Sequence, residues 1–261
     1  MGTPSSRFSQ FAAGEEGNYQ QLSRNILQIE NELYSPIRPK QPTQSMEKPT
    51  DALVKRGINY IEVRALDVNP FSAIGISESQ FHFLDVFLLS CLLMPSEALD
   101  ESQLTEAKDN MNKVVLEGRN PELKLLQGGE EISLPAWCDT LFAQFKQVAA
   151  LLDTANETDK YMAAVDEEWQ KVIDPAKTPS GVLLNALLKD DKDNSVFGLE
   201  LAERYKAEMA GYAYTHTDAN AFQAASQASL DAQADVEAAD SKDFDSFIRD
   251  YFNEPPAKKN A

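Results

Sequence analysis

Strand-like alternation of apolar and polar residues occurs in only two short segments of this chain, residues 25–34 and residues 59–66. From Ser77 onward the pattern is helical. An isolated pair of strands is marginally stable in water and leaves two edges unpaired. We therefore expect either that another polypeptide completes the sheet, or that the two strands form a small ribbon lying on a helical body.

The two alternating segments each divide into a polar and an apolar face. The polar faces carry Gln28, Glu30, Glu32 and Tyr34 in the first segment and Tyr60, Glu62 and Arg64 in the second. Pairing the segments would place both sets on one polar wall, backed by a hydrophobic layer. An edge strand facing water and one wall of an active site both have this pattern, so the alternation alone leaves both interpretations open.

The stretch between these segments, "SPIRPKQPTQSMEKPTDALVKRG" at residues 35–57, contains four prolines. This punctuation predicts a long loop, which carries the cations Arg38 and Lys40. Loops of this length are uncommon in compact domains unless they are functional or disordered.

The motif "SESQ" at residues 77–80 is a capping box that predicts a helix start before the apolar run at residues 81–94. This run is too short to span a bilayer comfortably, so we interpret it as a buried helix. The segment 219–239 is rich in Ala, Gln and Asp, and predicts a solvated helix or one that needs a partner surface. The remaining helical periodicity predicts helices at about 99–117, 134–155, 158–173, 179–190, 196–213 and 241–253.

These patterns together predict an α+β fold, in which a partial antiparallel sheet is followed by a mainly α-helical C-terminal region. We expect residues 1–76 to contain the strands and a long Pro-rich loop, and residues 77–253 to be helical. The tail at residues 254–261 is expected to be disordered.

The net charge of −18 limits the partners of the chain. Nucleic acids and anionic lipid are disfavoured, because phosphate binding requires clusters of Lys and Arg. No secretory signal is expected, since no basic region precedes an apolar run at the N-terminus. Cys91 and Cys138 lie far apart without a CxxC motif, which predicts neither a zinc site nor a disulfide framework. We expect a cytoplasmic protein without a membrane partner.

Glu62 and Arg64 stand two residues apart on the expected polar wall. A carboxylate can hold Mg²⁺ that bridges nucleotide oxygens, and a guanidinium can bind an oxyanion bidentately, so this pair suits phosphoryl chemistry. A Tyr on the neighbouring strand could supply a stacking surface and a hydroxyl. Glu–x–Arg is also common on solvated strand faces, and the pattern by itself favours that plainer interpretation.

Longer motifs add a resemblance. The stretches "NILQIENELYSPIRPK", "DALVKRGINYIEVRALDVNPFSAIGI", "FLDVFLLSCLL" and "NKVVLEGRNPELKL" resemble the C-terminal half of the proteobacterial type of glutamate–cysteine ligase. The similarity is dense from about residue 24 to residue 126, and it keeps the order of the later helices.

The resemblance implies a reaction in which ATP phosphorylates the γ-carboxylate of L-glutamate and the amine of L-cysteine attacks the acyl phosphate, with Mg²⁺ organising the triphosphate. It implies that Glu62 is a Mg²⁺ ligand, that Arg64 contacts the transferred phosphoryl group, and that Tyr34 helps form the cysteine pocket. It also implies that the strands belong to an incomplete glutamine-synthetase-like catalytic sheet. On spacing alone, lower-grade candidates for metal or phosphate contacts are Glu30, Glu32, Arg38 and Lys40.

Members of that family carry an additional N-terminal half, which supplies most of the sheet and several metal ligands. We therefore expect this chain to be the C-terminal portion of such a ligase, inactive without a separate N-terminal half. The alternative is a non-catalytic helical binding or regulatory module derived from the ligase.

Overall fold

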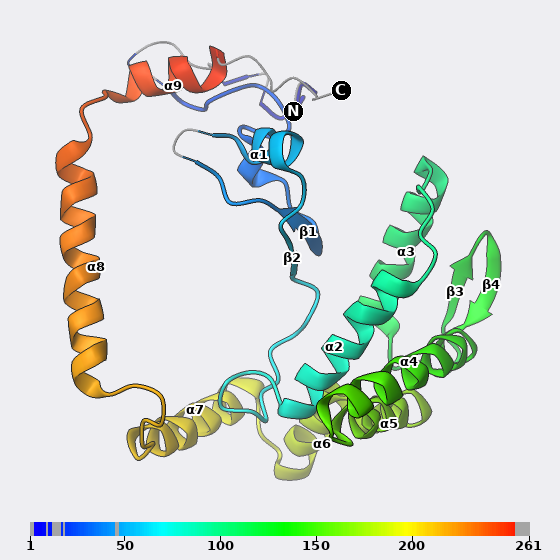
Figure 1. Cartoon of the computed structure of the whole chain (residues 1–261). Coiled ribbons are helices and arrows are strands. Elements are labelled where there is room, and N and C mark those ends of the chain that lie inside the picture. The colour runs from blue at the N-terminus through cyan, green and yellow to red at the C-terminus, as the bar shows by residue number, and fades with distance from the viewer. Residues whose placement is uncertain (1–2, 9, 12–16, 18, 45–46, 254–261) are drawn as a thin grey trace. The chain divides into compact units, whose positions relative to one another are not determined.

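The computed structural model describes residues 3–8, 10–11, 17, 19–44 and 47–253 (Figure 1). These residues are mainly helical and include two small antiparallel sheets of two strands each. The predicted fold class is confirmed. The chain divides into two compact units, one formed by Met1–Asp67 with Ala213–Ala261 and the other by Val68–Tyr212. The expected domain limits at residues 76 and 253 stay predictions, and the expected disordered tail lies outside the described residues.

The helices predicted from periodicity are present, with ends shifted by a few residues. The capping box is formed as expected, because the Ser77 hydroxyl accepts from the Gln80 N–H while the Gln80 side chain accepts from the Ser77 N–H. The helices of this part of the chain are α2 Glu78–Leu93, α3 Glu101–Glu117, α4 Leu134–Asn156, α5 Lys160–Ile173, α6 Pro179–Asp190, α7 Asn194–Ala210, α8 Ala219–Ala239 and α9 Phe244–Asn253.

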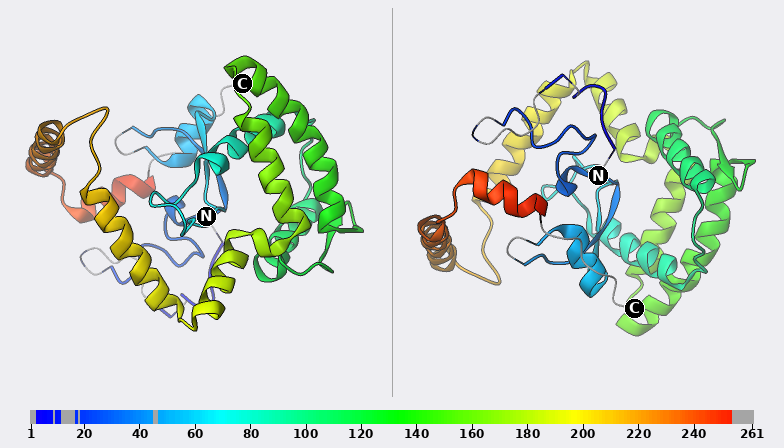
Figure 2. Two further views of the ribbon diagram at one scale, coloured as in Figure 1. Left: turned by 90° about the horizontal axis from the view of Figure 1, so that it is seen from below. Right: turned by 90° about the horizontal axis from the view of Figure 1, so that it is seen from above.

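The core of the unit Val68–Tyr212 lies between α2, α4 and α5, which pack side by side (Figure 2). Phe145 is central to it, with 3% of its surface exposed and its ring 5.3 Å from that of Phe142. The Phe83 and Phe87 rings reach Phe145 from α2. Apolar burial of these aromatic side chains is the main stabilising term of this unit.

The prediction that residues 81–94 form a buried helix is wrong for this chain. In α2 only Val86 and Ser90 are buried. Phe81, Leu88 and Leu92 remain 57%, 37% and 78% exposed. The physical reason is that α4 and α5 cover one side of α2, whereas its apolar residues surround the whole helix.

A hairpin that the alternation did not reveal follows α3. Strand β3 (Lys124–Gln127) pairs antiparallel with β4 (Glu130–Ser133) across the two-residue turn Gly128–Gly129. Both glycines have positive φ, 64° and 85°, as a tight hairpin turn of this length requires. The Gly-Gly dipeptide was therefore the available signal, and the expectation that strands occur only near the start of the chain is wrong.

The predicted strand at residues 25–34 is also wrong. Side-chain hydrogen bonds within this segment compete with strand pairing, since the Gln28 amide accepts from the Ser23 N–H at 2.8 Å and donates to the Ser23 carbonyl at 2.8 Å. Glu30–Glu32 then form a single 3₁₀ turn, η1.

The predicted loop at residues 35–57 instead contains strand β1 (Ile37–Lys40) and helix α1 (Pro49–Arg56). Pro39 is compatible with β1 because the sheet has only two strands, so every strand is an edge strand. Pro49 occupies the first helical position of α1, where its missing N–H costs nothing. The second strand was predicted correctly in type and lies at β2 (Tyr60–Val63).

The C-terminal helix α9 packs on the N-terminal part of the same unit. Ile248 is 8% exposed, the Asp245 carboxylate accepts from the Gly17 N–H at 3.2 Å, and the Lys48 ammonium lies 5.0 Å from the centre of the Tyr251 ring. The preceding helix α8 has no buried residue, so its prediction as a solvated helix or one needing a partner surface describes it well (Figure 1). Among the described residues, none of the helices is long and apolar enough to cross a membrane.

Candidate functional site

Strands β1 and β2 form the ribbon that carries the candidate site. They pair antiparallel with Arg38 opposite Glu62 and Lys40 opposite Tyr60. The pairing continues past the start of β1 and the end of β2, because the Arg64 N–H donates to the Pro36 carbonyl at 2.6 Å. Directly opposed residues share one face of a sheet. The ribbon therefore has a polar face made by Arg38, Lys40, Glu62 and Arg64.

Glu62 is held by one cation on each of its oxygens. Arg64 donates from Nε to Oε1 at 2.9 Å and has its Nη2 2.8 Å from the same atom. The Lys40 ammonium lies 3.1 Å from Oε2. The hydrogen bond from Arg64 and then that from Lys40 lower the pKa of the Glu62 carboxyl below its usual value, so Glu62 is ionised at neutral pH.

Tyr34 lies beside this cluster. The Arg64 guanidinium carbon is 6.0 Å from the centre of the Tyr34 ring, at the outer limit of a cation–π contact. The Tyr34 side chain is 66% exposed. The structure thus brings together the three residues to which the resemblance gives roles, Tyr34, Glu62 and Arg64.

Glu30 and Glu32 are engaged away from the ribbon. Glu30 accepts from the N–H and the hydroxyl of Thr50 at the start of α1. The Glu32 carboxylate accepts from the Gln28 N–H at 2.5 Å. Glu32 therefore holds the local turn and Glu30 connects it to α1, whereas the other two lower-grade candidates, Arg38 and Lys40, belong to the polar face.

Arg38 and Lys40 lie on β1, about ten residues after the segment in which the alternation predicts the first strand. The alternation continues through residues 37–40, and it could have been recognised despite the prolines, because edge strands tolerate proline. With both residues included, the polar face carries three cations and one carboxylate, and two of the cations contact that carboxylate. Such a surface is suited to binding an oxyanion such as a phosphoryl group or a carboxylate.

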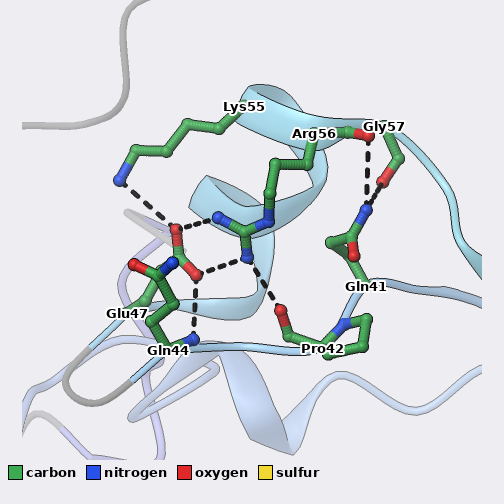
Figure 3. A network of polar contacts seen from close by, with 7 residues as sticks. All are labelled: Gln41, Pro42, Gln44, Glu47, Lys55, Arg56 and Gly57. Carbon is green, nitrogen blue, oxygen red and sulfur yellow. Dashed lines mark hydrogen bonds and ion pairs between the residues drawn. The ribbon is translucent and has the colours of Figure 1, made fainter.

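A network of polar contacts closes the connection between β1 and α1 (Figure 3). The Glu47 carboxylate accepts from both terminal nitrogens of Arg56, at 2.9 and 2.6 Å, and from the Gln44 N–H at 3.0 Å. Arg56 also donates to the Pro42 carbonyl at 2.7 Å. The hydrogen bond from Arg56 is the largest cause that lowers the pKa of Glu47 to about 2. This network fixes the path of the chain from one strand of the ribbon towards the other.

Several residues of the ribbon are buried in the opposite sense to their polarity, although Arg64 is exposed and Val63 is half-buried as their polarity predicts. The polar-face residues Arg38, Lys40 and Glu62 are half-buried, whereas Ile37 and Ile61 on the apolar face are 52% and 48% exposed. The expected hydrophobic layer behind the polar wall therefore lies open in this chain.

The residues present do not fit a metal site. Among the described residues, no group of three or more His, Cys, Asp or Glu side chains is arranged to hold a metal ion. Mg²⁺ requires several oxygen ligands in an octahedral arrangement, and the polar face offers one carboxylate that two cations already occupy. We therefore assign Mg²⁺ no step that this chain performs by its own residues.

Comparisons with known proteins show what this chain is similar to. A crystal structure of a glutamate–cysteine ligase from Francisella tularensis in complex with AMP matches 96% of this chain and 49% of that chain, with a TM-score of 0.84 and 31% sequence identity. A family model described as glutamate–cysteine ligase matches residues 1–114. Two curated glutamate–cysteine ligases, from Shewanella halifaxensis and Vibrio vulnificus, are 46% and 41% identical to this chain over 95% and 96% of its length.

Over about half of their length, then, amino acid ligases are homologous to this chain. More particularly, it is a half-length homologue of glutamate–cysteine ligase. It spans about half the length of the curated relatives it matches, 48% of both the Shewanella halifaxensis and the Vibrio vulnificus proteins.

Proposed function

We propose that this chain is the C-terminal portion of an ATP-dependent, cytoplasmic glutamate–cysteine ligase and that it is inactive without the remaining half. The proposal rests on the homology and on one structural observation. The β1–β2 ribbon leaves Ile37 and Ile61 half exposed on its apolar face, which is the condition expected of a sheet whose other strands lie in a separate polypeptide.

The proposed reaction has two steps. The γ-carboxylate of L-glutamate attacks the terminal phosphorus of ATP, which releases ADP and forms an acyl phosphate. The amine of L-cysteine then attacks that carbonyl, the C–O bond to phosphate breaks, and inorganic phosphate leaves with a proton lost from nitrogen. Positioning and charge compensation for both steps require groups on more than one side of the reacting atoms.

The polar face would supply one side. The Arg64 guanidinium would contact the transferred phosphoryl group, with Lys40 and Arg38 adding positive charge beside it. The Tyr34 ring, which lies against Arg64 and is largely exposed, would form part of the cysteine pocket. The role of Glu62 as a Mg²⁺ ligand remains a prediction that needs further ligands from the missing half.

The test is an assay of phosphate release that depends on ATP, glutamate and cysteine. The chain is assayed alone and after co-expression with the part of the Shewanella halifaxensis ligase that lies outside the 250 matched residues. We expect no activity from the chain alone and activity from the pair. Arg64→Ala and Glu62→Gln should abolish the activity of the pair, whereas Lys113→Gln, an exposed substitution on α3, should leave it unchanged.

A second class of function makes the opposite prediction. If the chain is a non-catalytic binding or regulatory module, a properly folded pair releases no phosphate, and partner binding is unaffected by Arg64→Ala and Glu62→Gln. Absence of activity from a stable complex of the two parts would therefore refute the proposed ligase function.

A further inference from the structure

Helix α2 carries apolar side chains around its whole circumference, and such helices are ordinarily buried on all sides. One side packs in the core through Val86. On another side, the open stripe of α2 consists of Phe81, Leu88 and Leu92, which are 57%, 37% and 78% exposed. Spacings of seven and four residues place these three side chains on one helical face.

Helix α3 repeats the same arrangement. The open stripe of α3 consists of Leu104, Met111 and Val115, again seven and four residues apart, with exposures of 55%, 40% and 74%. Glu106 and Asn110 lie away from this stripe and hydrogen-bond to the β3–β4 hairpin. The side of α3 that packs on the hairpin is thus polar, whereas the open side carries three apolar side chains with Lys108 among them, which is unlike an ordinary surface helix.

We propose that the open stripes of α2 and α3 form the docking surface for the polypeptide that the relatives carry outside the matched half. This inference rests on the proposed function, since it assumes that such a second part exists for this chain. Exposed apolar patches of this kind mark protein interaction sites. The relatives contain about as much chain again as the part matched here, so they have a polypeptide of sufficient length to cover both stripes.

A second copy of this chain is a less suitable occupant. Each copy carries a net charge of −18, and the repulsion between two such chains opposes self-association.

The test measures binding between this chain and the part of the Shewanella halifaxensis ligase outside the 250 matched residues, co-expressed and captured through a tag on that part. Leu92→Asp and Leu104→Asp should each weaken the complex about 100-fold, because the new carboxylate would be buried without a partner. Ser102→Asp is the matched control, since it adds the same charge to an exposed position on another side of α3. It should change the affinity by less than about twofold.

A fusion of the two parts, joined in the order of the relative, makes the test independent of how soluble the separate part is. Leu104→Asp should lower the urea midpoint of the fusion but not that of the isolated chain, in which Leu104 is already exposed. Ser102→Asp should change neither midpoint.

Three outcomes separate the hypotheses. Wild-type affinity and full ligase activity in Leu92→Asp and Leu104→Asp would overturn the docking surface and leave the proposed function intact. A complex that depends on both stripes but releases no phosphate would leave the docking surface and remove the ligase function. Dimers of the isolated chain that Leu104→Asp converts to monomers would identify a second copy as the occupant and overturn the inference.

Discussion

Asn110 is the side chain whose loss should most clearly test how α3 is held. Its amide fits both backbone groups of Leu126 in β3, because Nδ2 donates to the Leu126 carbonyl at 2.6 Å and Oδ1 accepts from the Leu126 N–H at 2.9 Å. Asn110 is only 8% exposed. We expect Asn110→Ala to destabilise the unit Val68–Tyr212 and to loosen the hairpin from the helix.

The magnitude follows from the two hydrogen bonds. Each contributes about 0.5–1.5 kcal/mol net, and leaving a half-buried backbone group without its partner adds to this loss, so Asn110→Ala should cost about 2–4 kcal/mol. Asn110→Asp should cost nearly as much. It keeps an acceptor for the Leu126 N–H, but it places a carboxylate oxygen against the Leu126 carbonyl.

Urea unfolding followed by circular dichroism measures the change in free energy, and amide hydrogen exchange of Leu126 reports the local effect. Asn112→Ala, at an exposed asparagine on the same helix, is the matched control and should change the free energy of unfolding by less than about 0.5 kcal/mol. If Asn110→Ala behaves like Asn112→Ala and the exchange of the Leu126 amide does not accelerate, the two hydrogen bonds of Asn110 do not hold the hairpin.

Three further predictions concern other parts of the chain. The pKa of Glu47 is lowered from 4.5 to about 2, so its contribution to stability is present above pH 4.5 and is lost as the pH falls towards 2. The urea midpoints of the wild type and of Glu47→Gln should differ at neutral pH and converge as the pH is lowered from 4.5 to 2. Gly129→Ala should destabilise the hairpin by about 1 kcal/mol in urea unfolding, because φ there is 85°, and an unchanged midpoint would contradict the turn geometry. Asp218 caps α8 by accepting a hydrogen bond from the Ala221 N–H. Asp218→Ala should therefore cost about 0.5–2 kcal/mol of helix stability and reduce the far-ultraviolet circular dichroism signal of the helix. Asp235→Ala, within the exposed helix, should not reduce this signal.

The helices from Ser77 onward could be predicted because their periodicity is accompanied, at several helix starts, by local capping signals that the structure uses. The capping box at Ser77 and the N-cap aspartates at the starts of α3 and α8 act within a few residues of chain. Local signals of this kind do not depend on what packs on the helix, and this is why helix positions were predicted more accurately than helix burial.

The strands were harder to predict, because pairing partners are distant in the chain. The alternation at residues 25–34 resembled a strand, but the Gln28 amide satisfies the Ser23 backbone locally, and the segment forms no strand. Shifting the first strand to β1 exchanges Glu30 and Glu32 for Arg38 and Lys40 on the polar face. The polar face therefore carries three cations and one carboxylate in place of the expected additional acidic residues, a composition that favours contacts to oxyanions.

The two predictions of burial that failed share one cause. The sequence of residues 81–94 is typical of a helix with apolar neighbours on all sides, yet Leu92 is 78% exposed. The alternation in β2 is typical of a strand whose apolar face is covered, yet Ile61 is 48% exposed. Both patterns would be costly on the surface of a finished protein, because exposed apolar area gains nothing from folding. Both are expected if these residues fold against a second polypeptide. The mismatch between apolar pattern and exposure is therefore what the proposed function expects, and adding the part of the relatives that lies outside the matched half should bury the α2 stripe and the apolar face of the ribbon.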